Sequence, residues 1–242
     1  GKLGVSYTYS VPVAELLQER LFITIPLALL AMGLSVVIAF SLGVYAASHH
    51  NQRGDVVIMG ISQLGISIPN FWLALLLILL FAVNAGWFAS GGFPGWDAGL
   101  WAALKALMLP ALALATVQGA ILARFTRSAV LEALSEDYVR TARAKGLTQR
   151  QTLWRHVLRN AMIPIVTVMG LQFANLLAGT IVVESVFSLP GIGRLIIQSI
   201  SNRDVVVVRD VVTLLVAMVV VINFVVDILY AVIDPRLRAR DV

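Results

Sequence analysis

Long apolar stretches separated by short polar segments make up most of this chain of 242 residues. A helix needs ~20 residues to cross a hydrocarbon core about 30 Å thick, and five stretches reach that length. They cover residues 21–47, 56–83, 101–123, 161–183 and 211–233. The apolarity is continuous and lacks the alternation over ~10 residues that is typical of membrane barrel strands. We therefore predict an all-α, polytopic membrane helical bundle, with residues 1–242 forming a single transmembrane domain.

Composition agrees with a membrane protein and excludes several kinds of site. Hydrophobic residues make up 59% of the chain and charged residues 13%, whereas soluble domains average about 25% charged residues. The chain has no cysteine, which excludes a disulfide framework, a thiolate nucleophile and a cysteine metal site. Its pI near 10.0 raises the question of nucleic acid binding, but the positions of the basic residues give a simpler explanation.

The basic residues are concentrated in one segment between apolar stretches and in the C-terminal tail. Residues 124–159 hold eight basic residues, Arg124, Arg127, Arg140, Arg143, Lys145, Arg150, Arg155 and Arg159, against three acidic ones, Glu132, Glu136 and Asp137. Residues 84–100 contain no Lys or Arg and carry Trp87, Phe88, Phe93 and Trp96, which is typical of an outer interfacial loop. The positive-inside rule then predicts that loop 124–160 and the C-terminus are cytoplasmic and that residues 1–20 are external.

An external start indicates that an earlier span precedes this chain. Residues 11–20 are typical of a short amphipathic segment along the outer interface, and no signal sequence precedes residue 21. The chain also begins with Gly and not with Met. We therefore expect six spans in the intact protein, five of them visible here.

The basic segment has the pattern of a short helix. Ser135 precedes Glu136 and Asp137, which predicts an N-cap followed by acidic residues in the first turn. Gly146 predicts the C-terminal stop, because a residue with positive φ at this point is most often Gly. Glu136 and Arg140 are spaced i,i+4 in the favourable order, worth only ~0.2–0.5 kcal/mol, so the helix needs packing to be stable.

A second helix is predicted immediately after the first. Thr148 and Gln151 form a T-x-x-Q capping box, and the apolar positions at Trp154 and Leu158 continue toward the next span. One interpretation is a solvated connector whose charges only enforce topology. A helix-turn-helix that reads DNA is disfavoured, because both ends of the segment are tethered to spans.

Three motifs resemble one family. The sequence EDYVRTARAKG at 136–146, followed by RNAMIP at 159–164, resembles the cytoplasmic loop of ABC importer permeases, especially the B-type subunit of the dipeptide, oligopeptide and nickel group. Arg140, Thr141 and Ala142 stand where the wider family has E-A-A before the Gly, so the acidic first residue is absent. ESVFSLPGIGR at 184–194 resembles the external loop of this group, and DILYAVIDPR at 227–236 resembles its terminal signature.

The resemblance implies half of the translocation pathway of an ATP-driven importer in a bacterial or archaeal inner membrane. The implied partners are a second homologous permease, two cytoplasmic ATPase subunits and an external solute-binding protein, with no nucleic acid and no cofactor. The implied coupling residues are Glu136, Asp137, Tyr138, Arg140, Thr141, Ala142, Lys145 and Gly146. Short peptides are the leading substrate, with glutathione, nickel chelates and sugars left open. The chain has no G-x-x-x-x-G-K-[ST] motif, so we expect no ATP binding and no enzyme activity here.

Polar residues inside the predicted spans are candidates for the pathway. They are Gln63, Ser67, Asn70, Thr116, Gln118, Gln172, Asn175 and Asn223. We prefer Gln118, Gln172 and Asn175, which lie in the two spans that flank the basic loop, although a hydrogen bond between helices worth ~0.6 kcal/mol is an alternative for each. Pro190, Gly191 and Ile192 predict a turn that acts as an external gate or is an inert turn.

Prolines and histidines add little more. Pro69, Pro110 and Pro164 interrupt or begin helices and are candidate bends. Histidines occur only in segments predicted to be cytoplasmic, and no H-E-x-x-H motif is present, which disfavours an intramembrane enzyme. These histidines are His49, His50 and His156.

An ion-coupled secondary transporter is the alternative to an importer subunit. Asp227 is the one acidic residue well inside a predicted span, one heptad from Asp234 and close to Arg236 and Arg238. A proton relay would use such a residue, but pairing at the membrane boundary explains it as well. Inverted repeats, which many secondary transporters contain, are not evident in the sequence.

Overall fold

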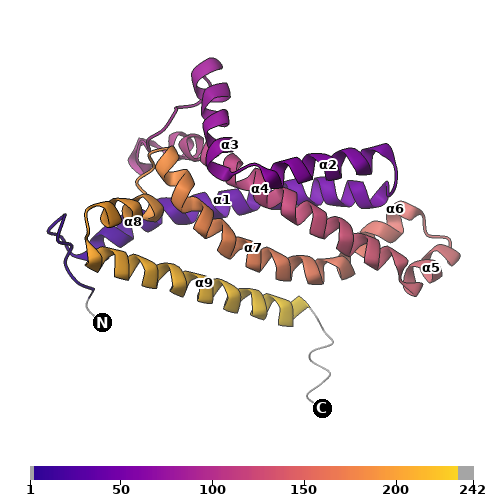
Figure 1. Ribbon diagram of the computed structural model, residues 1–242. Helices are drawn as coiled ribbons and strands as arrows, with labels where there is room; N and C mark the ends of the chain where they lie inside the picture. The colour runs from indigo at the N-terminus through magenta and orange to yellow at the C-terminus, as the bar shows by residue number, and fades with distance from the viewer. Residues whose placement is uncertain (1–2, 234–242) are drawn as a thin grey trace, which may run out of the picture. The chain divides into compact units, whose positions relative to one another are not determined.

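The computed structural model describes residues 3–233, which are mostly helical (Figure 1). The long helices are α1 (Val13–Ser48), α4 (Leu100–Ser135), α7 (Leu158–Val186) and α9 (Val205–Ile233). The shorter ones are α2 (Arg53–Ser67), α3 (Asn70–Leu77), α5 (Asp137–Ala144), α6 (Gln149–Thr152) and α8 (Ile192–Ser201). The π-helical segments η1 (Ile78–Asn84) and η3 (Leu153–Val157) and the 3-10 turn η2 (Trp96–Ala98) complete the helices. Within the described residues, β pairing is limited to an isolated bridge between Val5 and Pro12.

Four described helical segments are long and apolar enough to cross a membrane. They are Val13–Ser48, Leu100–Ser135, Gln149–Val186 and Val205–Ile228. A fifth candidate is the pair Arg53–Ser67 and Asn70–Asn84, which is bent by 102°. The predicted all-α membrane bundle is therefore confirmed.

The second predicted span is broken at Pro69, one of the prolines predicted to interrupt or begin a helix. Residues 56–83 divide into α2 and the α3–η1 segment, and Pro69 occupies the N-cap of α3 in an extended conformation. Pro lacks the backbone N–H of a helix interior and disfavours helical geometry in the residue before it, so the helix breaks at this point. Pro110 and Pro164 lie inside α4 and α7, which continue through them.

Several predicted ends were wrong, because helices extend beyond their apolar cores. α4 continues to Ser135 through the basic residues that were predicted to be loop, and α1 already begins at Val13. Residues 13–20 are thus the first turns of α1 and not a separate interfacial segment. Apolarity marks only the part of a helix suited to hydrocarbon, whereas backbone hydrogen bonding continues until a cap or a break stops it.

The chain forms two compact units, each containing part of α1, α4, α7 and α9. The first unit comprises Gly1–Leu34, Ile68–Val117 and Phe173–Val220. The second comprises Ser35–Ser67, Gln118–Gln172 and Val221–Val242. The first contains the turn between α7 and α8, and the second contains the basic segment with α5 and α6.

The core of the first unit joins the start of α1 to α8 and the start of α9. Its buried residues are Val13, Leu16 and Leu17 of α1, Ile192, Leu195 and Ile196 of α8, and Val207 and Val211 of α9. The α8 residues recur at i, i+3 and i+4, the spacing of one helix face, so this short helix lies with its apolar face inward.

The core of the second unit joins α5 and η3 to the ends of three long helices. Its buried residues are Val44 and Ala47 of α1, Val130 and Ala133 of α4, Val139 of α5, Leu153 and Val157 of η3, and Leu158, Ala161 and Ile165 of α7. The basic segment is thus packed against the helices that flank it and is more than a solvated connector.

Candidate functional site

The helix α5 begins one residue later than the sequence indicates. Its N-cap is Glu136, with φ −70° and ψ 149°, and Asp137 lies in the first turn. Ser135, predicted to be the N-cap, instead ends α4 and donates its hydroxyl to the carbonyl oxygen of Glu132 at 2.7 Å. Serine often bonds back to the carbonyl three residues earlier, which competes with capping.

The two faces of α5 differ sharply. Val139 and Ala142 are buried at 2% and 7% exposure, and the Tyr138 hydroxyl donates to the carbonyl oxygen of Ala133 at 3.1 Å. The predicted coupling residues therefore differ in exposure. Ala142 is buried and Tyr138 is half-buried. The exposed ones are Glu136, Asp137, Arg140, Thr141, Lys145 and Gly146. This exposed face is the part of α5 that a second protein can contact.

The expected pairing on α5 shifts by one residue. The guanidinium of Arg140 lies 3.7 Å from the carboxylate of Asp137, an i,i+3 pair, where the sequence predicts Glu136 as the partner. Both side chains are more than four-fifths exposed, so the pair contributes little to stability. Packing of Val139 and Ala142 is what holds the helix.

The C-terminus of α5 is a tight left-handed turn at Gly146. The φ angle of Gly146 is +88°, as predicted from the glycine stop. Its N–H donates to the carbonyl of Arg143 at 2.9 Å, and the N–H of Leu147 donates to the carbonyl of Ala142 at 3.3 Å. These are the two bonds of a Schellman motif, which satisfies the last carbonyls of the helix and redirects the chain.

The capping box that starts the next helix is confirmed. The Gln151 N–H donates to the hydroxyl oxygen of Thr148 at 3.3 Å, and the Thr148 N–H donates to the amide oxygen of Gln151 at 3.0 Å. α6 and η3 then lead into α7. The whole connector from α4 to α7 is therefore fixed at both of its turns, by the Schellman motif and by the capping box.

A buried carboxylate closes the turn between α7 and α8, and its role is not predictable from the sequence motif at 184–194. Glu184 has an exposed fraction of 0%. Its Oε1 accepts from the hydroxyl of Thr24 at 2.6 Å, and its Oε2 accepts from the N–H groups of Gly193 at 2.7 Å and Arg194 at 3.3 Å. The Thr24 hydroxyl oxygen also accepts from the N–H of Ile192 at 2.9 Å. We call Glu184, Thr24 and these backbone groups the Glu184 latch.

The predicted gate residues lie within reach of this latch. Pro190 is half-buried, and Gly191 and Ile192 are buried, so the turn is packed in this state. A Cβ on Gly191 would overlap the carboxylate of Glu184, and one on Gly193 would overlap the backbone of Ile181. Small residues here allow the carboxylate to reach the first N–H groups of α8, which have no partners within the helix.

The predicted pathway residues come from both units. Gln118 and Gln172 belong to the second unit and Asn175 to the first. Gln118 is buried at 6% exposure, and its amide oxygen has no hydrogen-bond partner among the described residues. Gln172 is half-buried and Asn175 is exposed. Their place in the pathway stays a prediction.

An ion pair in the second unit connects the first turn of α2 to α4. Arg127 donates from Nε to Asp55 Oδ1 at 2.6 Å and from Nη2 to Oδ2 at 2.7 Å, and the Asn51 N–H donates to Oδ2 at 3.0 Å. Asp55 is buried, and His50 Nδ1 lies 3.3 Å from its Oδ2. Nothing in the spacing of these residues predicts their contact.

Asp227, the residue expected for a proton relay, is exposed on α9. Its expected neighbours Asp234, Arg236 and Arg238 lie outside the described residues. Among the described residues there is no cluster of His, Asp or Glu able to hold a metal ion.

The helices and the packed polar connector define the class as a multi-pass membrane protein, and comparison with known proteins gives its family. Residues 39–239 match the family described as "Binding-protein-dependent transport system inner membrane component". The chain belongs to this family of ABC importer permeases.

Two relatives illustrate the match. The chain is 44% identical over 238 residues to a putative peptide transport system permease protein of Brucella abortus (strain 2308), covering 98% of this chain and 75% of the relative. It is 42% identical over 240 residues to the glutathione transport system permease protein GsiC of Escherichia coli (strain K12), covering 99% and 76%.

Solved structures share the fold. The MetNI methionine ABC transporter in inward facing conformations matches with a TM-score of 0.77 and 20% identity, over 91% of this chain and 97% of that chain. An amino acid ABC transporter crystallised with histidines matches with a TM-score of 0.69 and 18% identity, over 90% and 94%.

Proposed function

We propose that this chain forms half of the translocation pathway of an ATP-driven importer for short peptides. The named relatives support this substrate class, because one is a putative peptide permease and the other a glutathione permease, and glutathione is itself a tripeptide. The intact importer would contain a second homologous permease, two ATPase subunits and an external solute-binding protein. Its membrane would be the inner membrane of a bacterium or archaeon, with the basic segment and the C-terminus on the cytoplasmic side and residues 1–20 outside.

The exposed face of α5 is the proposed contact with an ATPase subunit. The observation that carries this assignment is a short polar helix with its inner face packed between membrane-crossing helices and its outer face free. Val139 lies in the same core as Val130 of α4 and Leu158 of α7. A displacement of α5 is therefore passed to both flanking helices, because close-packed interiors transmit strain.

The proposed mechanism is a two-state movement. Closure of the ATPase subunits would shift α5 and, through the shared core, change the positions of α4 and α7. The turn at Pro190, Gly191 and Ile192 would gate the external end, with the Glu184 latch holding it in the packed state. Gln118, Gln172 and Asn175 are the proposed contacts along the pathway. Family membership favours this function over an ion-coupled secondary transporter based on Asp227.

The test is co-purification of the tagged full-length permease with its ATPase subunit from mild detergent. The variant Arg140→Glu/Lys145→Glu reverses charge on the exposed face of α5, and we expect it to lower recovery of the ATPase by about tenfold, a loss of ~1.4 kcal/mol in binding. The elution volume of the variant permease in size-exclusion chromatography, compared with that of the wild type, checks that the variant is folded.

A matched control is Arg159→Glu, which reverses charge at an exposed residue outside α5. Equal recovery of the ATPase from the α5 variant and from the wild type would overturn the assignment of α5 as the contact.

A further inference from the structure

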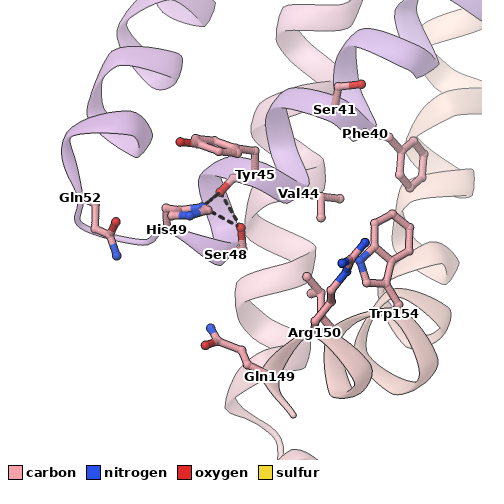
Figure 2. A pocket seen from close by; sticks show the side chains of 11 residues that line it. Phe40, Ser41, Val44, Tyr45, Ser48, His49, Gln52, Gln149, Arg150 and Trp154 are labelled. Carbon is pink, nitrogen blue, oxygen red and sulfur yellow. Dashed lines mark hydrogen bonds between the residues drawn. The ribbon is translucent and has the colours of Figure 1, made fainter.

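A cavity of about 710 Å³ lies in the second unit between the C-terminal end of α1 and the α6–η3 segment (Figure 2). The walls from α1 are Phe40, Ser41, Val44, Tyr45 and Ser48, with His49 and Gln52 just beyond the helix. The facing wall consists of Gln149, Arg150, Leu153 and Trp154. The volume is in the range of ~300–1,000 Å³ that small ligands occupy.

The cavity changes from apolar to polar along α1. Phe40 and Val44 line one end, whereas His49 and Gln52 line the other. The rise along α1 from Phe40 to Ser48, eight positions later, is about 12 Å. The apolar end belongs to a helix able to cross a membrane, and the polar end is where that helix stops. This gradient matches a molecule with an apolar body and a polar head lying along the helix.

The polar end is ordered by its own contacts. The rings of Tyr45 and His49 are stacked with centroids 4.3 Å apart. His49 Nδ1 lies 3.0 Å from the hydroxyl oxygen of Ser48 and 3.1 Å from the carbonyl oxygen of Tyr45. Figure 2 shows Arg150 and Trp154 on the opposite wall, across the cavity from this stack.

The charge of the cavity has one sign. Arg150 is its formally charged lining residue, and none of the lining residues is acidic. A smaller cavity of about 280 Å³ adjoins it, lined by Arg150, Gln151, Trp154 and Arg155. Trp154 is 62% exposed. An exposed Trp beside Arg residues at the end of a membrane-crossing helix is typical of the headgroup level of a bilayer.

We propose that this cavity binds an anionic phospholipid, with its headgroup at Arg150 and His49 and its upper acyl chain along Phe40 and Val44. The proposal rests on the proposed function in one respect, because the permease topology places the cavity at the cytoplasmic leaflet. Basic pockets between membrane helices on that side suit anionic headgroups. A soluble protein partner fits less well, because Phe40 lies two turns inside a helix that crosses the membrane.

A bound lipid would support the connector that carries α5. Leu153 lines the cavity and also belongs to the core that contains Val139 of α5. The headgroup would lie between Arg150 of α6 and His49 just after α1, which line opposite walls of the cavity. Anionic lipid is therefore expected to strengthen coupling between α5 and the flanking helices.

The test measures lipid retained by the full-length permease in nanodiscs of mixed phosphatidylglycerol and phosphatidylcholine, by native mass spectrometry. We expect the wild type to retain phosphatidylglycerol preferentially. Arg150→Gln should lower that preference by about fivefold, the effect of one basic residue at an anionic surface. Arg150→Lys should keep most of the preference.

Two further variants separate the site from general charge and from folding. Arg159→Gln removes the same charge at an exposed residue outside both cavities and should leave the preference unchanged. Ser41→Trp fills the cavity without changing charge and should lower retention of phosphatidylglycerol. Co-purification of the ATPase subunit with Arg150→Gln should stay at the wild-type level, so this test and that of α5 fail separately.

Four results would overturn the proposal. One is equal retention of the two lipids by the wild type, and another is an equal loss from Arg150→Gln and Arg159→Gln. Displacement of phosphatidylglycerol by inorganic phosphate would assign the site to a soluble anion. Loss of the ATPase subunit from Arg150→Gln, with lipid retention intact, would assign this wall to a protein partner.

Discussion

The carboxylate of Glu184 caps the N-terminus of α8 from outside that helix. The first N–H groups of α8 have no acceptor within the helix, and the N-cap residue Gly191 has no side chain to offer one. Glu184 reaches these groups from the end of α7, and Thr24 of α1 joins the same network. Three elements are thereby held by one side chain, which makes the network sensitive to a change of a single atom.

Replacement of that carboxylate by an amide is therefore expected to be costly. In Glu184→Gln, one of the two side-chain acceptors becomes an NH₂ group, which cannot accept from Thr24 or from the N–H groups of α8. We expect a loss of ~1–3 kcal/mol in unfolding free energy, measured by thermal unfolding in detergent, together with slower transport. Glu19→Gln is the control, because Glu19 is exposed on α1. Equal melting of both variants would contradict the latch.

The carboxyl group of Asp204 is expected to make the free energy of unfolding depend on pH. Burial acts to raise the pKa of its carboxyl, but hydrogen bonds from the Ser6 hydroxyl at 2.5 Å and the N–H groups of Thr8 and Val207 at 3.1 and 3.3 Å outweigh it, so the pKa is lowered. A lowered pKa in the folded state contributes stability above the unfolded value of ~3.9, and this is lost as the pH falls through the folded pKa. The wild type should exceed Asp204→Asn in melting temperature at neutral pH, and the difference should shrink below about pH 4. A difference that is constant over this pH range would contradict the assignment.

At the scale of elements, the connector from α4 to α7 is the best example of local sequence determining structure. The glycine stop at Gly146 and the capping box at Thr148 and Gln151 were both confirmed, because each depends on residues within six positions of one another. The N-cap was wrong by one residue, because Ser135 has two competing acceptor arrangements that the sequence does not rank. The Glu184 latch and the pair of Asp55 with Arg127 were missed, because their partners come together only through the packing of distant helices.

The left-handed backbone at Gly146 predicts that a side chain at this position destabilises the connector. Its φ of +88° is left-handed, and a Cβ at this residue would meet nothing within 4 Å, so the backbone conformation alone determines the effect. We expect Gly146→Ala to cost ~1–2 kcal/mol and to weaken coupling of ATP hydrolysis to transport. Gly60→Ala is the matched control: Gly60 also has open space but lies in α2 without positive φ, so alanine should be neutral or stabilising there. Thermal unfolding of both variants, with transport-coupled ATPase rates, checks the expectation.

At the scale of the whole molecule, the class was predictable because continuous apolarity is a strong signal for membrane helices. The ends of those helices were less predictable, because a helix extends past its apolar part. The break at Pro69 was also less predictable, because proline has different effects in different contexts. Pro69 separates two helices bent by 102°, whereas α4 and α7 continue through Pro110 and Pro164. Whether a proline breaks a helix is decided by neighbours that a single sequence does not identify.

The predicted membrane topology, with the basic segment on the cytoplasmic side and residues 84–100 outside, can be tested by thiol labelling. These 242 residues contain no cysteine, so each single-cysteine variant introduces one new thiol at a known position. Lys145→Cys is expected to react with an impermeant thiol reagent only after the cytoplasmic side is opened, whereas Trp87→Cys should react in intact cells. Both residues are exposed, so access and not burial determines labelling. The reverse pattern would invert the proposed topology.

The ion pair of Asp55 and Arg127 restricts which substitutions are tolerated at these two positions. Removing the arginine leaves a buried charge with too few partners, whereas exchanging both residues together for a neutral pair avoids that penalty. The two positions are 72 residues apart, so their joint change cannot arise from local helix preferences. Across relatives, we expect them to vary as a coupled pair, with charged partners retained together or lost together.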